Sequence, residues 1–155
     1  MTVWWITLAS SYLLCLVAGM NAKTVYSNGY YTKKYNKFFS FMSVAILVLV
    51  AGLRSGIGDT PTYIQGYKTD APSTIAGSIK LLFSGKKDAG FYFYQGILKS
   101  IVNNPNVFIF VTSLITIVLI FIMYYKYSQL LELSVFLFIT TGCYLVTMNG
   151  IRQYL

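Results

Sequence analysis

Residues 52–67 read GLRSGIGDTPTYIQGY, and within them a run without charged residues gives way to a polar segment. The apolar run ends at Leu53, and Arg54, Gly56, Gly58 and Asp59 follow at once. A cation at the edge of an apolar run is often a membrane anchor, but glycines and an acid beside it indicate a shaped polar site. We interpret this segment as the mouth of a site at a bilayer surface, with residues 149–153 (NGIRQ) as its second half.

The whole chain has the composition of an integral membrane protein. Of its 155 residues, 56% are hydrophobic and 10% are charged, whereas a soluble domain has about 25% charged residues. The net charge is +8. Because the basic residues lie between apolar runs, lipid headgroups and anionic substrates are the expected partners, rather than nucleic acid. The absence of histidine and of any CxxC pair excludes the usual zinc and haem sites, so no metal or cofactor is expected.

Four apolar runs are long enough, or nearly so, to cross a hydrocarbon core of about 30 Å as helices. The sequence therefore predicts an all-α integral membrane protein with four transmembrane helices at about residues 3–20, 38–53, 106–125 and 130–148. The first run lacks a preceding basic segment, which favours a transmembrane helix over a cleaved signal peptide. A short turn joins the last two runs as an antiparallel hairpin, in which Glu132 can pair with Lys126.

Two polar regions separate these runs. Residues 21–37 hold four lysines and no acid, with a turn predicted at Asn28-Gly29, and the positive-inside rule places them in the cytoplasm. Residues 54–105 form the larger region, which is then expected on the outer face together with the N-terminus and Arg152.

The larger region carries helix signals of its own. Two patterns resemble helix starts, namely Asp59-Thr60-Pro61 and Asp70-Ala71-Pro72. Apolar residues at helical spacing follow the second pattern, and Ser84-Gly85 marks the end of that helix. These pieces are too short or too polar to cross a bilayer, so they predict short interfacial amphipathic helices within residues 59–103.

An even number of crossings places Arg54, which follows the second run, and Arg152, which follows the fourth, on the same face of the membrane. Two guanidinium groups at one headgroup level suit a diphosphate, because each can bind phosphate oxygens in a bidentate manner. The alternative is that each is an interfacial anchor. Asp59 is the candidate general base for a sugar hydroxyl, although it can equally cap a helix or pair with Arg54.

Other polar and aromatic residues near these positions are candidate substrate contacts. Asn149 and Gln153 flank Arg152 and can donate hydrogen bonds to phosphate or sugar. Tyr63 can stack on a sugar ring, although it can equally belong to an interfacial aromatic belt. Asp88 is a weaker candidate of the same kind as Asp59.

Three segments, taken in order between the hydrophobic runs, resemble the EpsG family of bacterial polysaccharide polymerases, which are related in function to Wzy-type O-antigen polymerases. They are Arg54-x-Gly56-x-Gly58-Asp59 with Tyr63, the Gly90-Phe91 segment, and NGIRQ at residues 149–153. The resemblance covers most of the chain. It implies multi-pass enzymes that join oligosaccharide units carried on a polyprenyl diphosphate, at the outer face of the bacterial plasma (inner) membrane.

The same resemblance implies roles for individual residues. Arg54 and Arg152 would contact the lipid diphosphate, and Asp59 would lie beside the acceptor. This chain departs from the family in having Thr60 where a tyrosine is frequent, and Asp88 near the position of a glutamate.

Members of this family are much longer than this chain. We therefore expect residues 1–155 to be a single polytopic membrane domain, the N-terminal part of a larger glycosyltransferase-type polymerase, and inactive alone. Its remaining helices, membrane lipid and other polysaccharide-export components are the implied partners. Exopolysaccharide, capsule or O-antigen biosynthesis is the implied process. Two alternatives stay open: a transporter (flippase) of lipid-linked sugars, and a small non-enzymatic accessory membrane protein.

Overall fold

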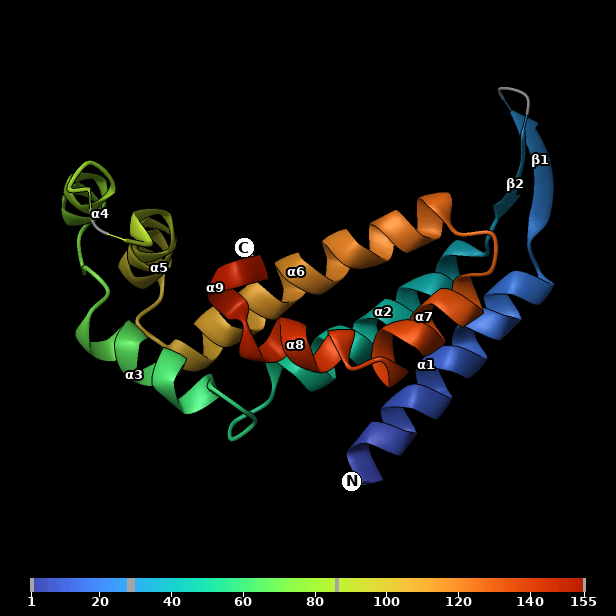
Figure 1. Cartoon of the computed structure of the whole chain (residues 1–155), viewed down its shortest axis with the longest axis horizontal. Coiled ribbons are helices and arrows are strands. Elements are labelled where there is room, and N and C mark those ends of the chain that lie inside the picture. The colour runs from blue at the N-terminus through green and yellow to red at the C-terminus, as the bar shows by residue number, and fades with distance from the viewer. Residues whose placement is uncertain (1, 28–29, 86, 155) are drawn as a thin grey trace. The chain divides into compact units, whose positions relative to one another are not determined.

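The computed structural model describes residues 2–27, 30–85 and 87–154, and the side chains of residues 27, 30–32, 153 and 154 lie outside that description. The chain is 75% helical, which confirms the all-α prediction. The helices are α1 (Thr2–Met20), α2 (Lys37–Gly52), α3 (Thr60–Thr69), α4 (Ile75–Leu82), α5 (Ala89–Ile101), α6 (Pro105–Tyr127), α7 (Leu131–Thr140), α8 (Cys143–Asn149) and α9 (Ile151–Tyr154) (Figure 1).

The lysine-rich segment between α1 and α2 forms a small antiparallel hairpin that the sequence did not predict. Strands β1 (Lys23–Ser27) and β2 (Tyr30–Lys34) pair with Lys23 opposite Lys34. β-branched or aromatic residues occupy the middle of β1 (Thr24, Val25, Tyr26) and the first part of β2 (Tyr30, Tyr31, Thr32), a composition that favours extended backbone. The turn predicted at Asn28-Gly29 falls outside the described residues.

Among the described residues, two helices, α1 and α6, are long and apolar enough to cross a membrane, and the bent pair α7 and α8 makes a third if it is one span. The prediction of four spans is thus confirmed only in part. The second predicted span corresponds to α2, which is apolar but has 16 residues. At a rise of about 1.5 Å per residue, a helix of that length is shorter than the hydrocarbon core.

The fourth predicted span is not one continuous helix. α7 and α8 meet at an angle of 58°, at Gly142, whose φ of +82° lies in the left-handed region that glycine adopts without steric cost. The Thr140 and Thr141 hydroxyls donate to the carbonyls of Phe136 and Leu137, a side-chain pattern that often accompanies helix bends. Hydropathy did not reveal the break because the residues on both sides are apolar.

Contacts divide the chain into two compact units, which we describe separately. Unit 1 consists of Met1–Val50 and Ile115–Val146, and unit 2 of Ala51–Leu114 and Thr147–Leu155. Unit 1 therefore holds the N-terminal helix and most of the apolar spans. Unit 2 holds Arg54, Arg152 and the polar region of residues 54–105.

In unit 1, small side chains let the helices approach closely. α1 buries Thr7, Ser11, Cys15 and Ala18 on one face. Ser43 of α2 donates to the Ser11 carbonyl at 3.1 Å and accepts from Cys15 Sγ at 3.1 Å. Small polar residues of this kind are typical of helix interfaces in membranes.

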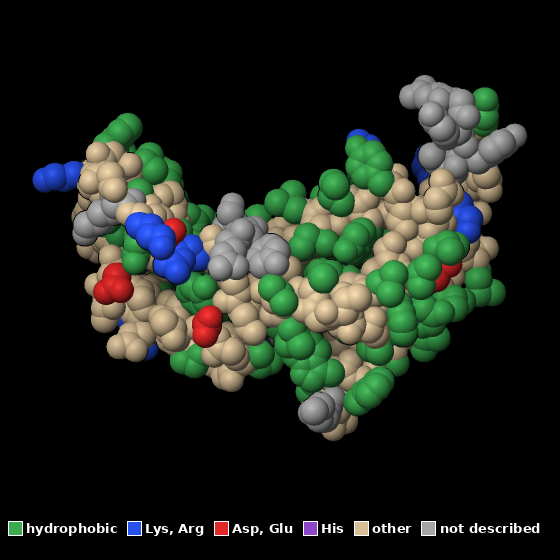
Figure 2. Space-filling view, in the orientation of Figure 1, with side chains coloured by type: hydrophobic (Ala, Val, Ile, Leu, Met, Phe, Trp, Pro, Cys, Tyr) green, Lys and Arg blue, Asp and Glu red, His purple; other side chains and the backbone are tan. Residues whose placement is uncertain are grey.

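The outer surface of α1 and α7 is apolar, as a lipid-facing surface would be. Figure 2 shows hydrophobic side chains over the visible face of these helices. On α1 the exposed apolar residues include Trp5, Ile6 and Leu13, and on α7 they include Leu133 and Leu137.

The turn between α6 and α7 is held by Tyr35 of unit 1. The Tyr35 hydroxyl donates to the Ser128 carbonyl and accepts from the Leu131 amide. The suggested pair of Glu132 with Lys126 is not formed: Lys126 Nζ lies 5.2 Å from the centroid of the Tyr127 ring. Within the described part of the chain, Glu132 Oε2 is buried without a hydrogen-bond partner.

Unit 2 has a core of its own around α3 and the first half of α6. Tyr67 stacks on Phe108 with ring centroids 4.8 Å apart. Partly buried aromatic residues from α3 and α5 surround this pair. The fully buried members are Tyr67, Ala71, Phe108, Ile109 and Ile151.

Of the two helix starts predicted in this region, one is confirmed and one is wrong. α3 begins at Thr60 with proline in its first turn, although Asp59 makes no capping hydrogen bond through its described side chain. Asp70 instead ends α3. The next helix begins at Ile75, and its N-cap is Thr74, whose hydroxyl accepts from the Gly77 amide.

The packing of α4 on α5 gives a first prediction, because it depends on Gly96. A methyl group at Gly96 would collide with the Ser78 hydroxyl and lie 2.8 Å from Pro72 Cγ. We expect Gly96→Ala to destabilise the protein by about 1–3 kcal/mol through overpacking, measured as thermal unfolding in detergent. Gly66→Ala in α3 is the control, since its nearest neighbour, Asp70 Oδ2, is at 3.8 Å. Equal stability of both variants would show that α4 and α5 do not depend on close approach.

Candidate functional site

Arg54 lies immediately after α2, in the interior of unit 2. The whole residue is only 7% exposed to solvent. Nη1 donates to the Ala51 carbonyl at 2.6 Å and to Ser113 Oγ at 2.9 Å. Nε donates to Thr60 Oγ1 at 3.0 Å, and Nη2 donates to the Met148 carbonyl at 2.9 Å. One guanidinium group therefore joins the end of α2, the start of α3, the middle of α6 and the end of α8.

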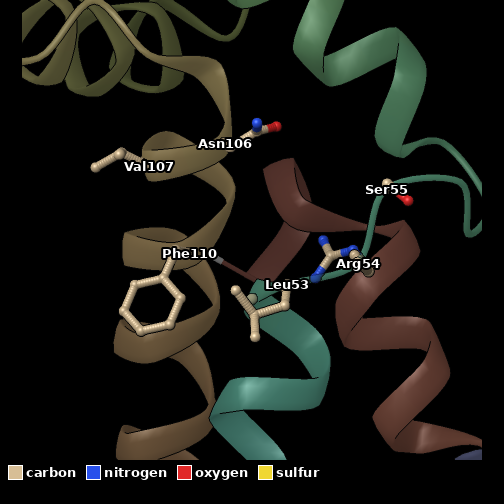
Figure 3. Close-up of a pocket in the computed structure, with 7 residues that line it drawn as sticks. Leu53, Arg54, Ser55, Asn106, Val107 and Phe110 are labelled. Carbon is tan, nitrogen blue, oxygen red and sulfur yellow. The ribbon is translucent and has the colours of Figure 1, made fainter.

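Figure 3 shows the surroundings of this arginine. The guanidinium lies over the end of α2, beside the α8–α9 segment, while Leu53 faces α6 (Figure 3). A pocket of about 340 Å³ opens here. Its lining is mostly apolar with polar groups at one side: Gly52, Leu53, Arg54, Ser55, Asn106, Val107 and Phe110.

The alternative interpretation of Arg54 as a lipid-facing anchor does not agree with this geometry. An anchor extends its charged end away from the protein, towards water and headgroups. Arg54 instead directs its N–H groups to Thr60, Ser113 and backbone carbonyls inside unit 2. The sequence could not reveal the hydroxyl and carbonyl groups that accept hydrogen bonds from Arg54, because they come from four separate segments.

Arg152 of α9 has a different environment. Its side chain is 49% exposed, and Nη1 lies 3.0 Å from Asp88 Oδ2, whose side chain is 27% exposed. Arg152 also lines a pocket of about 340 Å³ together with Gly90, Phe91 and Tyr94 of α5. The pocket thus combines a guanidinium with aromatic rings, which are groups that bind an anionic sugar derivative.

The remaining predicted site residues lie at several places in unit 2. Asp59 is exposed at the start of α3. Tyr63 packs against the core, with its ring 6.0 Å from that of Phe91. Asn149 lies against Gly58, and its Oδ1 is buried with no hydrogen-bond partner among the described residues. Gln153 lies in α9, but its side chain is outside the described residues.

The contact between Gly58 and Asn149 explains one of the glycines in the first motif. Gly58 has a φ of +55°, and a Cβ atom there would overlap Asn149 Oδ1. Only glycine meets both conditions. The segment before α3 and the end of α8 therefore lie in contact at Gly58 and Asn149.

The tyrosine beside the Arg152 pocket remains protonated at neutral pH. Burial raises the pKa of Tyr94, although a hydrogen bond with Thr112 at 3.0 Å lowers it in part. The Thr112 hydroxyl donates to the Phe108 carbonyl, so the Tyr94 hydroxyl is the donor to Thr112. Tyr94 is thus a neutral contact group and a poor proton acceptor.

In the part of the chain that the structure describes, no three His, Cys, Asp or Glu side chains gather as metal ligands. Asp88, which pairs with Arg152, has no second ion-pair partner among the described side chains.

The apolar helices and the polar unit 2 define a class: a helical membrane protein whose candidate site combines arginine, carboxylate and aromatic side chains. The chain belongs to the EpsG family, whose model matches residues 37–155 and so includes all of unit 2. This confirms the resemblance inferred from the sequence, and the family indicates polysaccharide biosynthesis by a polymerase. A search of curated proteins and a search of solved structures each gave no match.

Proposed function

We propose that the full-length protein polymerises oligosaccharide repeat units carried on a polyprenyl diphosphate, in exopolysaccharide, capsule or O-antigen biosynthesis. The site would lie on the outer face of the bacterial plasma membrane. Unit 2 of this chain would hold the reacting end of the lipid-linked donor, and other helices of the protein would complete the site.

The observation that carries this proposal is the position of Arg152. Its guanidinium is half exposed at a pocket with aromatic walls, so a ligand can reach it without any part of unit 2 unfolding. A sugar ring would lie against Phe91 and Tyr94, and the diphosphate would accept hydrogen bonds from Arg152. Charge that develops on the departing diphosphate would then be stabilised by a preorganised donor.

The other sequence-based assignments differ in the support they receive. Diphosphate binding by Arg54 stays a prediction, and its hydrogen bonds inside unit 2 support a positioning role for it. Asp59 as the base stays a prediction as well. Tyr63, Asn149 and Gln153 remain candidate contacts; the Asn149 side chain packs on Gly58 with its Oδ1 buried.

A time course of product length tests the proposal. Cells depleted of the protein and complemented with the full-length gene should accumulate a ladder of products, spaced by one repeat unit and lengthening with time. A transporter of the same lipid-linked sugar would relocate single units without lengthening them. If the protein is only an accessory, cells depleted of it would still form the ladder. Either of these two results would overturn the polymerase assignment.

A further inference from the structure

Arg152, which lines a pocket with Gly90, Phe91 and Tyr94, forms an ion pair with Asp88, and this pair joins the start of α5 to α9. It is the one ion pair found between the side chains described. Figure 2 shows acidic and basic side chains gathered over this part of unit 2. The carboxylate is therefore placed beside the group that would bind the diphosphate.

This ion pair can exchange partners at small cost. Both side chains are partly exposed, and exposed pairs contribute only about 0–1 kcal/mol to stability. A diphosphate offers the guanidinium several charged oxygens and bidentate geometry. When Arg152 turns to such a ligand, Asp88 keeps its place at the pocket and loses its partner.

The backbone holds Asp88 in position for a second task. Asp88 has φ +62° and ψ +27°, precedes the first turn of α5, and makes no capping hydrogen bond through its side chain within the described residues. Its carboxylate is thus not used to cap the helix. Two residues along, the position of a Cβ atom at Gly90 has no neighbouring atom within 4 Å, so there is room for a ligand group at this glycine, which lines the Arg152 pocket.

Other groups at this pocket are less suited to accept a proton. Burial raises the pKa of Tyr94, and its hydroxyl already donates to Thr112. Asp59, the base suggested by the sequence, is exposed at the start of α3 and forms no ion pair with Arg152 among the described side chains. Asp88 is the acid that lies within hydrogen-bonding distance of Arg152.

We propose that Asp88 is the general base of the transfer reaction, held by Arg152 until a lipid diphosphate takes over that guanidinium; this rests on the polymerase function proposed above. The acceptor hydroxyl gives its proton to a carboxylate oxygen of Asp88, and its oxygen forms a bond to the anomeric carbon of the donor sugar. The bond from that carbon to the diphosphate oxygen breaks, and the electron pair leaves with the diphosphate. Arg152 holds the departing anion.

The test compares acid-to-amide variants of the full-length protein. Asp88→Asn is a clean change for the backbone, because asparagine adopts positive φ as readily as aspartate. General-base catalysis contributes about 10²–10⁴-fold, so we expect Asp88→Asn to lower the rate of ladder formation at least about 100-fold. Binding of geranylgeranyl diphosphate in detergent should be retained or tightened, because Arg152 has lost its competing partner.

Asp70→Asn is the matched control, because Asp70 is an exposed acid at the end of α3. The Asp70→Asn variant should form the ladder at the wild-type rate. A structural ion pair would predict that Asp88→Asn loses binding and rate together, which would overturn the inference. So would wild-type rates in Asp88→Asn, or loss of rate confined to Asp59→Asn. A failure of the polymerase proposal itself is distinct, since the wild-type protein would then form no ladder.

Discussion

Replacing Arg152 with lysine in the full-length protein is expected to reduce polymer formation by about 100-fold or more, while membrane insertion and folding remain unchanged. Loss of one preorganised donor at a developing oxyanion typically costs about 10²–10³ in rate. Lysine keeps the positive charge but loses the planar fork that binds two phosphate oxygens. The side chain is 49% exposed, so its replacement removes little packing.

The measurement is the rate and length distribution of the product ladder, with protein amount in the membrane followed in parallel. Lys80→Gln is a suitable control, because Lys80 is an exposed cation on α4 that lines none of the pockets described above. If the Arg152→Lys variant forms a ladder of normal length, this residue does not bind the diphosphate in the proposed way. A variant that disappears from the membrane would instead show that α9 needs the arginine to fold.

The apolar helices were predictable from sequence because each is encoded by residues next to one another. The runs at residues 3–20 and 106–125 match α1 and α6 closely, since hydropathy and length decide such segments. The break at Gly142 was not predictable in this way, because a bend depends on one backbone conformation within an apolar run. The hairpin of β1 and β2 was missed because the lysines around it indicated only a polar loop.

The candidate site was predictable only as a list of residues. Arg54, Arg152 and Asp88 were all named from sequence, but Ser113 and Met148, which accept from Arg54, lie far from it along the chain, as Asp88 lies far from Arg152. Asp88 and Arg152 are brought together by the packing of α5 and α9, and no local pattern encodes that contact. Arg54 shows the same limit, because whether an arginine faces lipid, ligand or protein depends on acceptors from other segments.

Substitution of Arg54 is expected to affect the stability of the folded protein, unlike substitution of Arg152. We expect Arg54→Lys to destabilise the folded protein by about 3 kcal/mol or more, because a single ammonium group cannot replace a fork whose donors reach Ala51, Thr60, Ser113 and Met148. Each buried polar group left without its partner costs about 1–3 kcal/mol. Thermal unfolding in detergent, followed by loss of the monodisperse species, measures this loss.

Ser113→Ala supplies the matched control for Arg54, since it removes one acceptor and leaves the guanidinium in place. We expect it to cost about 1 kcal/mol, and the double variant Arg54→Lys, Ser113→Ala should be less destabilised than the sum of the two, because both changes affect one interaction. The opposite pattern is equally informative. If Arg54→Lys unfolds as the wild type does yet forms no polymer, Arg54 binds the diphosphate directly, because a residue that only positions its neighbours would lower stability before it lowered activity.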